Sequence, residues 1–383
     1  MNVCGLFAGI GGLELGLHRA GHRTTALCEI EPAAQNILEK RFPDIELHSD
    51  VRDLVRLPQG TELLAGGFPC QDLSQAGQTR GLAGKESGLV NELFRLLRTN
   101  DVPNVLLENV SFILALGKGQ AMRHITASLE ELGYRWAYRI VDTRAFGLPQ
   151  RRQRLFLVAS RVLEPSNVVM RGNFPDDEPV NWRGRACGFY WTEGLRGLGW
   201  AVGGVPTLKG GSTIGIPSAP AIWFPDGMIG TPHICDAELL QGFDADWTAP
   251  AEAVSRSSSR WKLVGNAVSV PVAEWIGRGL AGCAGGIEFP IRSFDLGKSW
   301  PKAAFGGPNT PAMAAEISKF PEFNTAPDIA AFLRYPVKPL SIKATEGFLR
   351  RLKSGSLRYP PEFLTALEVH VDRCRDDTRL AVA

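Results

Sequence analysis

Residues 3–20 read VCGLFAGIGGLELGLHRA, and this stretch decides the fold. The segment 3–7 is short and apolar, as expected of a buried strand, whereas residues 13–20 have the apolar spacing of a helix. The turn between them contains Gly9, Gly11 and Gly12, which let the backbone bend sharply and approach a ligand closely. A strand, a glycine-rich turn and a helix in this order predict the start of an α/β fold.

The same alternation continues outward to residue 160. Further strands are expected at residues 24–30, 45–48, 62–65, 105–107, 135–141 and 155–159, and helices at residues 32–41, 91–99 and 120–132. Pro32 suits the first turn of a helix, because the N–H that proline lacks would have no helical partner there. We therefore expect an α/β fold with a mostly parallel sheet and helices on both faces, in which ligands bind beyond the carboxyl ends of the strands.

Beyond residue 160 the composition changes: glycine, proline and tryptophan become frequent and helical periodicity fades. Residues 161–259 are expected to form a smaller, irregular, β-rich domain whose tryptophans serve mainly its core. The helix-like residues 271–280 indicate a return to the first domain, which then comprises residues 1–160 and 260–282. Residues 283–383, with a basic helical segment at 343–353, form a C-terminal extension of unknown role.

The overall composition limits the class of protein. The 383 residues carry a net charge of +2, with 44% hydrophobic and 21% charged residues, as in an ordinary globular protein. This charge neither requires nor excludes a polyanionic partner. The 7 cysteines are scattered without a CxxC pair, which argues against a disulfide framework and against a metal site. The sequence shows no signal segment and no long apolar run, so we expect a cytoplasmic protein without a membrane span.

Three strand ends indicate a nucleotide-like cofactor. The FAGIGG turn follows the first strand, Glu29 ends the second and Asp50 ends the third. The turn alone fits a dinucleotide pyrophosphate and a simple tight turn equally well, since the strict dinucleotide fingerprint is absent. Glu29, however, can accept hydrogen bonds from ribose hydroxyls, and Asp50 can accept one from an adenine amino group. Together they favour an adenosyl ligand without a phosphate grip, which points to S-adenosylmethionine.

The fourth strand leads into Gly66-Gly67-Phe68-Pro69-Cys70-Gln71, which places a thiol at a strand end on a proline-stiffened backbone. A lone cysteine is most often a small buried hydrophobe, but its thiolate is also a strong nucleophile. Glu108 and Asn109 end the fifth strand, and an arginine-rich segment at residues 146–154 precedes the last. A thiol, a carboxylate and guanidinium groups at one sheet edge favour attack on a carbon electrophile.

Eight motifs occur in a fixed order along the chain: FAGIGG, CEIEP, HSD, GGFPCQ, ENV, GLPQRRQR, LLQGF and GNAVSVP. With these motifs, residues 3–280 resemble the C5-cytosine-specific DNA methyltransferase family of the bacterial modification type. The resemblance implies the Rossmann-like fold of S-adenosylmethionine-dependent methyltransferases, with residues 161–259 as the target-recognition domain. It also implies DNA (cytosine-5)-methyltransferase activity on a flipped-out base, in a restriction-modification system or in phage defence.

The resemblance assigns roles to the residues at the sheet edge. Cys70 would attack C6 of the extruded cytosine, so that C5 can accept the methyl group. Glu108 would stabilise the charge that develops at N3, with Asn109 in a supporting role. Arg152 and Arg154 would hold O2 of the base and order the Glu108 carboxylate. No metal is implied.

The resemblance also implies two sets of contacts and a set of partners. The cofactor would contact Phe7, Ala8, Gly9, Gly11, Gly12, Glu29, Ile30, Asp50, Val51, Phe68, Pro69, Asn266 and Ala267. The DNA would contact Gln75, Arg80, Gln150, Thr207, Leu208, Lys209 and Gln241. The expected partner is double-stranded DNA, with a cognate restriction endonuclease or defence-system proteins beside it. The protein itself is expected to be a monomer at the bacterial nucleoid.

The chain departs from the family pattern at two places. Ser87-Gly88 stands where relatives often have Arg-Gly, and Cys235-Asp236 stands where they usually have an arginine next to an acid. Three other functions stay open: an RNA cytosine-5 methyltransferase on the same scaffold, a non-catalytic DNA-binding relative and a nucleotide-dependent oxidoreductase. The long variable segment between Arg154 and Gln241 favours the reading of duplex DNA.

Overall fold

The structure is a computed structural model that describes residues 1–68, 88–176, 181–212, 214, 216, 218–282, 286, 288–296 and 299–382. The chain divides into two compact units. Unit 1 comprises Met1–Ala145, Gln153–Asp176 and Val268–Phe323. Unit 2 comprises Phe146–Arg152, Asp177–Ala267 and Asn324–Ala383.

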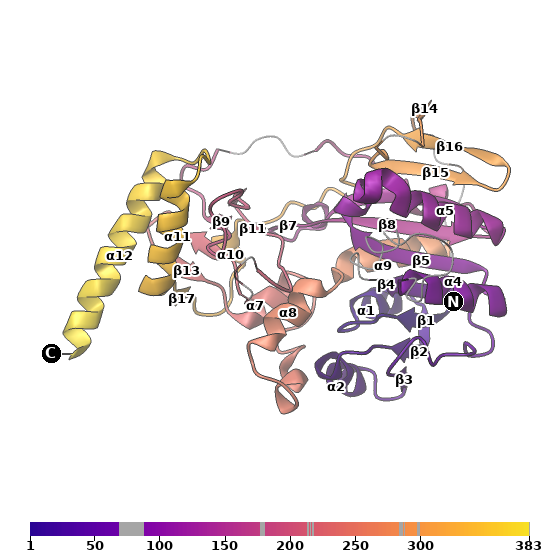
Figure 1. The fold of residues 1–383 in the computed structure, drawn as a ribbon, viewed down its shortest axis with the longest axis horizontal. Coiled ribbons are helices and arrows are strands. Elements are labelled where there is room, and N and C mark those ends of the chain that lie inside the picture. Colours follow the sequence, from indigo (N-terminus) through magenta and orange to yellow (C-terminus); the bar gives the residue numbers. More distant parts are fainter. Residues whose placement is uncertain are drawn as a thin grey trace. The chain divides into compact units, whose positions relative to one another are not determined.

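Unit 1 is built on a 10-stranded sheet (Figure 1). In order across the sheet the strands are β14 (Ile291–Ser293), β16 (Thr310–Ala315), β15 (Ala303–Gly307), β6 (Arg135–Asp142), β8 (Gln153–Ser160), β5 (Asn104–Val110), β4 (Leu63–Gly67), β1 (Asn2–Leu6), β2 (Arg23–Cys28) and β3 (Glu46–His48). The pairings from β3 to β5 are parallel. Those from β5 to β14 are antiparallel.

Helices cover both faces of this sheet. They are α1 (Gly12–Arg19), α2 (Pro32–Arg41), α4 (Val90–Thr99), α5 (Gln120–Glu131), α6 (Ser166–Val169) and α9 (Val270–Ala281). Cys4 and Leu6 of β1 share a core with Phe94 of α4 and Ile125 of α5. Gly5 points to the opposite face, because successive strand residues alternate, and there it lies against Glu14 of α1.

The expected alternation up to residue 160 is confirmed, because each predicted strand and helix lies within a few residues of its observed range. The sheet is mixed rather than mostly parallel, since the hairpin β15–β16 pairs with β6 and extends the antiparallel half. This hairpin consists largely of alanine and glycine, which are depleted in strands. Its sequence therefore gives no clear strand pattern.

Unit 2 combines small strands with helices. Its 5-stranded antiparallel sheet has the order β10 (Ala201–Val202), β9 (Cys187–Phe189), β12 (Ala221–Trp223), β13 (Ile229–Thr231) and β17 (Lys338–Pro339). A separate parallel pair is formed by β7 (Gln150–Arg151) and β11 (Val205–Pro206). The helices are α7 (Ile234–Leu239), α8 (Ser259–Asn266), α10 (Ile329–Phe332), α11 (Ile342–Ser354) and α12 (Pro361–Val382).

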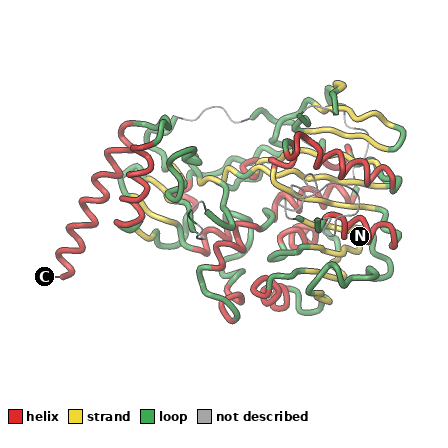
Figure 2. Tube along the Cα trace, viewed as in Figure 1, coloured by secondary structure: helices red, strands yellow, loops and turns green. Residues whose placement is uncertain are grey.

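The C-terminal helices α11 and α12 lie side by side and complete the core of unit 2 (Figure 2). Phe348 of α11 and Phe363 of α12 are fully buried and pack against Phe189 of β9, with ring centroids 5.1 and 4.9 Å away. Trp200 and Trp223 pack against the same cluster, as the composition predicts. The chain end therefore supplies a substantial part of this core.

The two units cut the chain differently from the expected boundaries of 1–160 with 260–282, 161–259 and 283–383. The C-terminal extension is not a separate body, because its first part, up to Phe323, belongs to unit 1 and the rest belongs to unit 2. The functional roles of those expected domains stay predictions. Among the described residues, no helix has the length and apolar character that a membrane crossing needs.

A buried acid lies between β1 and α1. Glu14, in the first turn of α1, is fully buried, and a side chain at Gly5 of β1 would collide with its carboxyl group. Burial raises the pKa of Glu14 from 4.5 to about 7, and the negative charge of Glu29 raises it further. Burial also raises the pKa of two neighbouring thiols, Cys4 of β1 and Cys28 of β2, to about 12. Unlike these thiols, Glu14 changes its protonation near neutral pH.

We predict that Glu14 makes the stability of the protein depend on pH. The folded state binds the proton more tightly than the unfolded chain, so the stabilisation is complete below pH 4.5 and is lost as the pH rises through about 7. The loss amounts to roughly 3 kcal/mol. In urea unfolding, Glu14→Gln should gain stability relative to the unmutated chain between about pH 5 and about pH 8. Parallel pH profiles of the two proteins would contradict this assignment.

Candidate active site

The candidate active site of unit 1 lies where the parallel strands end. Phe7 follows β1, Glu29 follows β2, Asp50 follows β3 and Phe68 follows β4, while Glu108 lies near the end of β5. Since neighbouring parallel strands end at the same edge of a sheet, these residues share that edge. The sequence-predicted residues of the first five strands are thus brought together.

The turn after β1 has a backbone conformation that few residues adopt. The φ angles of Phe7, Gly9 and Gly11 are 55°, 56° and 83°, in the left-handed region. For Phe7, a non-glycine residue, this conformation costs on the order of 1 kcal/mol, and such strain clusters at ligand sites. The N–H of Ala8 donates to the carbonyl of Cys28 at 3.1 Å, which ties the turn to the end of β2.

The carboxylate of Glu29 fixes this turn from the neighbouring strand. It accepts hydrogen bonds from the N–H of Gly9 at 2.7 Å and from the N–H of Glu31 at 2.8 Å. The side-chain amide of Gln35 donates to the Glu29 carbonyl at 2.6 Å. An ionised carboxylate has about four acceptor positions, so Glu29 keeps capacity for the hydroxyl groups of a ligand.

The remaining residues of this edge differ in exposure. Ile30 is 61% exposed, whereas Val51 is 4% exposed and Gly12 is buried at the start of α1. The carboxylate of Asp50 is already paired with Arg52, whose guanidinium lies 2.5 Å away. Hydrogen bonds from Arg52 hold the pKa of Asp50 below its usual value. An adenine amino group would therefore share the Asp50 carboxylate with Arg52.

The register of β5 and β8 brings Glu108 and Arg154 together. Val110 lies opposite Arg154, so Glu108 is the diagonal neighbour of Arg154 on the same face of the sheet. Arg154 Nε lies 3.2 Å from Glu108 Oε1, and the two side chains are 15% and 10% exposed. The two side chains thus form an ion pair, while the role of Arg154 in ordering Glu108 on the base stays a prediction.

Asn109 points to the other face of β5 and holds the end of β4. Its Nδ2 donates to the carbonyl of Phe68 at 2.9 Å, and both residues are buried. This hydrogen bond fixes the backbone at the last described residue before the predicted nucleophile. Pro69, Cys70, Gln75 and Arg80 lie outside the described residues.

Arg152 differs from the prediction that it lies beside Arg154 on the base. It belongs to unit 2, is 1% exposed and donates to the carbonyls of Leu208 at 3.0 Å, Gly265 at 3.2 Å and Ala267 at 2.5 Å. These bonds join two segments of unit 2. The structure therefore gives Arg152 a bracing role, because its guanidinium is engaged by buried backbone carbonyls.

Three predicted DNA contacts are also buried within unit 2. Gln150 and Gln241 are fully buried and Leu208 is 2% exposed. Gln150 donates to the carbonyl of Leu240 at 2.9 Å and accepts from the N–H of Leu208 at 2.9 Å. These side chains support the segment around Leu208 from inside rather than face solvent, whereas Thr207 is half-buried and Lys209 is exposed.

Asn266 and Ala267, predicted to contact the cofactor, stand at the boundary where the chain leaves unit 2. Asn266 is exposed, and a side chain at Gly210 would collide with its amide. The end of α8 therefore packs closely against the segment that follows Lys209. A cofactor contact for Asn266 and Ala267 stays a prediction.

The comparisons with known proteins decide the family. Residues 1–184 match the family of C-5 cytosine-specific DNA methylases. Over 390 residues the chain is 44% identical to the Type II methyltransferase M2.BsuMI of Bacillus subtilis strain 168, covering 98% of both chains. The chain belongs to this family. It is a DNA cytosine-5 methyltransferase, as the motifs predict, and the RNA enzyme is not favoured.

Other relatives match a smaller part of this methyltransferase. Type II methyltransferase M.BanI of Aneurinibacillus aneurinilyticus is 36% identical over 159 residues, which are 40% of this chain and 37% of that protein. Among solved structures, Entamoeba histolytica EhMeth has a TM-score of 0.53 at 16% identity, covering 73% of this chain and 97% of its own. S. pombe Dnmt2 has a TM-score of 0.52 at 16% identity, covering 72% and 96%. The methyltransferase fold is thereby confirmed.

Sequence reasoning missed one cluster of this methyltransferase, in which Cys235 and Glu238 are buried and Asp246 is exposed. Cys235, where the family usually has arginine, lies with Glu238 and Asp246 so that their ligand atoms are within 4.8 Å of one another. Arg260 lies between the acids, with its NH2 group 2.9 Å from Glu238 and 3.3 Å from Asp246. The Arg260 guanidinium thus already occupies the place between these acids that a metal ion would take. The spacing of the residues in sequence gives no signal for this cluster, because the fold brings its members together from α7, α8 and the loop between them.

We predict that Arg152 and Arg154 contribute differently to stability. Arg152→Met would leave three carbonyl groups of unit 2 without their buried donor, and should lower the free energy of unfolding by about 3 kcal/mol. Arg154→Met should cost less stability, because Arg154 and its partner Glu108 are more exposed and water can replace part of the lost interaction. Urea unfolding of both variants measures the difference. Equal losses would refute the bracing role of Arg152.

Proposed function

We propose that this methyltransferase transfers a methyl group from S-adenosylmethionine to C5 of a flipped-out cytosine in a specific duplex sequence. The transfer proceeds through a transient bond between Cys70 and C6 of the base. The observation that carries the proposal is the Glu108–Arg154 ion pair at 3.2 Å. It lies at the same strand edge as the turn that Glu29 fixes.

The described residues fit an adenosyl cofactor. Glu29 offers a fixed carboxylate to ribose hydroxyls, Asp50 offers an acceptor and Ile30 offers an exposed apolar surface to a ring. The left-handed turn leaves room for a ligand, because a Cβ atom at Gly9 would meet no described atom within 4 Å. When bound, S-adenosylmethionine supplies an electrophilic methyl group on a sulfonium.

The residues of the chain prepare cytosine to accept that methyl group. C5 of cytosine is a weak nucleophile, and addition of the Cys70 thiolate to C6 makes it enamine-like. Negative charge then moves toward N3, where a proton shared with Glu108 stabilises it. The ion pair with Arg154 orients the Glu108 carboxylate for this contact. After methylation, loss of the C5 proton and elimination of Cys70 restore the aromatic ring and the thiol.

Unit 2 is the part of the chain that we assign to reading the DNA. A cytosine inside a duplex is out of reach of a thiol, so the base must be extruded, which costs a few kcal/mol. Thr207 and Lys209 stay accessible on a segment held from inside by Gln150 and Arg152. A lysine there suits a phosphate group of the DNA backbone. A cognate restriction endonuclease, a monomeric state and a location at the nucleoid complete the proposal.

We predict that Cys70→Ser abolishes adduct formation. A duplex that carries 5-fluorocytosine traps the enzyme, because the fluorine cannot leave as the proton does.

A second assay measures methyl transfer. With methyl-labelled cofactor and DNA from a host without cytosine methylation, the unmutated enzyme should transfer the label to the DNA. Cys70→Ser should transfer it more slowly by on the order of 10³-fold or more. Cys374→Ser, on α12, is the matched control and should still form the adduct with the fluorinated duplex.

Denaturing gels show the adduct, and bisulfite sequencing identifies the methylated sequence. An adduct formed by Cys70→Ser, or undiminished methylation by it, would rule out the proposed mechanism. A matched RNA that is methylated as fast as the DNA would instead place the enzyme among RNA methyltransferases.

We predict that Glu108→Gln lowers turnover by about 10²- to 10⁴-fold, because the amide cannot share a proton with N3. Cofactor binding, measured by calorimetry, should stay unchanged, since Glu29 rather than Glu108 holds the turn of the cofactor. Turnover within twofold of the unmutated enzyme would remove Glu108 from the mechanism.

A further inference from the structure

We propose that Arg351, on the C-terminal helix α11, positions Lys209 for contact with the DNA backbone. Arg351 acts through the loop of residues 190–197, which we call the bridging loop. The inference rests on the DNA methylation proposed above. It assigns a function to the end of the chain, for which the sequence predicts only a basic helical segment.

The first step is the contact between α11 and the bridging loop. Arg351 is half-buried and donates from Nε to the carbonyl of Glu193 at 2.8 Å and from NH2 to the carbonyl of Trp191 at 2.7 Å. Gly194, with a φ of 117°, lies so close that a Cβ atom there would be 3.2 Å from the Phe348 ring and 3.4 Å from Arg351. One guanidinium of α11 thus sets the backbone of the loop.

The second step leads from the bridging loop to Lys209. The carboxylate of Glu193 forms an ion pair with Lys209 Nζ, and the same ammonium group lies 3.7 Å from the centre of the Tyr190 ring. The hydroxyl of Tyr190 donates to the carbonyl of Thr207 at 2.6 Å. Two residues of the loop therefore hold the segment that carries Thr207 and Lys209.

The ion pair with Glu193 also limits how Lys209 can meet a phosphate. The two side chains are 41% and 19% exposed, so the ammonium group of Lys209 reaches solvent while the carboxylate is mostly covered. A phosphate group must share the lysine with Glu193 or replace that carboxylate. Arg351 sets the position of Glu193. That position determines where the Lys209 ammonium group points and how easily a phosphate group can reach it.

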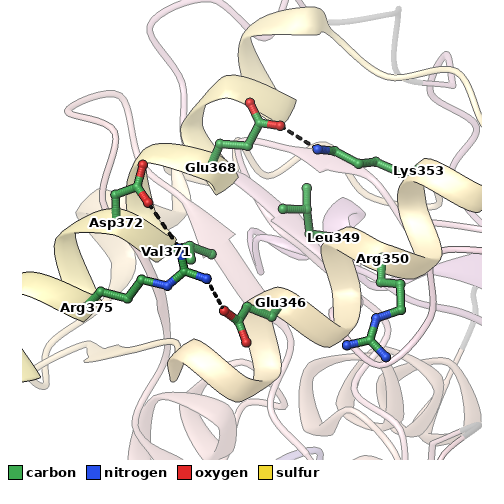
Figure 3. Close-up of a pocket in the computed structure, with 8 residues that line it drawn as sticks. All are labelled: Glu346, Leu349, Arg350, Lys353, Glu368, Val371, Asp372 and Arg375. Carbon is green, nitrogen blue, oxygen red and sulfur yellow. Dashed lines mark hydrogen bonds and ion pairs between the residues drawn. The ribbon is translucent and has the colours of Figure 1, made fainter.

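The adjacent residue provides a matched control. Arg350 carries the same charge one position earlier in α11, but it is exposed and lines a groove between α11 and α12 (Figure 3). Across that groove Lys353 pairs with Glu368 and Arg375 with Glu346, while Asp372 pairs with Arg375 within α12. Arg350 forms no ion pair with the residues that the structure describes. Its loss removes a positive charge and leaves the bridging loop untouched.

The test measures methyl transfer to DNA from a host without cytosine methylation, at varied DNA concentration. Arg351→Met should raise KM for DNA about tenfold and change kcat by less than about twofold, since the reacting groups lie in unit 1. Arg350→Met should change KM by less than about twofold. In Arg351→Met, the slope of log KM against log salt concentration should decrease by about one, as expected when one phosphate contact is lost.

A double-mutant cycle with Lys209→Met separates this role from general weakening of unit 2. If Arg351 acts through Lys209, then Arg351→Met in the Lys209→Met background should raise KM little further. Arg351→Lys, which keeps the charge but lacks the two-pronged donor geometry, should give an intermediate KM. Arg351→Lys also disturbs unit 2 less than Arg351→Met does. Thermal unfolding of each variant verifies that it is folded.

Several outcomes would overturn the proposal. The first is an unchanged KM for DNA in folded Arg351→Met or Arg351→Lys. The second is a rise in KM in Arg350→Met that equals the rise in Arg351→Met. The third is a double variant whose rise in KM is the full product of the rises caused by Arg351→Met and Lys209→Met alone. An unmutated enzyme that methylates no DNA would instead refute the proposed function, so the two failures are distinguishable.

Discussion

The register between β5 and β8 is the constraint on which the active site depends. It sets Glu108 and Arg154 diagonally on one face of the sheet and leaves Asn109 on the other. Because side chains alternate along a strand, a shift of one residue in this pairing would put Arg154 on the face away from Glu108 and break the ion pair. The same strand thus presents a carboxylate to the reacting base and, through Asn109, fixes the carbonyl of Phe68. The antiparallel pairing of β5 with β8 thus places the Glu108–Arg154 ion pair at the edge where the parallel half of the sheet ends.

A second theme is the use of arginine to hold backbone carbonyls. Arg139 in unit 1 donates to the carbonyls of Ser318 and Arg171 at 2.9 Å each. Arg152 and Arg351 do the same in unit 2. A planar guanidinium with five N–H groups can serve several carbonyls at once, which the ammonium group of lysine does less well. Irregular segments, whose backbone carbonyls have no N–H partner in a sheet, are held together by these arginine hydrogen bonds.

Much of unit 1 could be predicted from the sequence, because its short apolar strands alternate regularly with helical patterns. The turn at Gly9, the strand-end acid Glu29 and the pair Glu108 and Asn109 follow from local pattern and order. Arg152 and Arg154 could not be separated, since residues two positions apart look equivalent until one is buried among carbonyls. The same holds for Gln150, whose polarity indicated DNA but whose amide satisfies backbone groups inside unit 2. Contacts between distant segments carry no local signal.

Unit 2 is assembled from three separated stretches of the chain, and the last of them ends at the C-terminus. Its core needs Phe348 and Phe363 of the third stretch beside Phe189 of the second, which is synthesised earlier. Chains fold as they leave the ribosome, and a unit whose core is incomplete exposes apolar surface meanwhile. During translation, the apolar face of β9 therefore stays uncovered until α11 and α12 have been synthesised. A copy cut off before α11 would leave this face exposed, and exposed apolar surface favours aggregation.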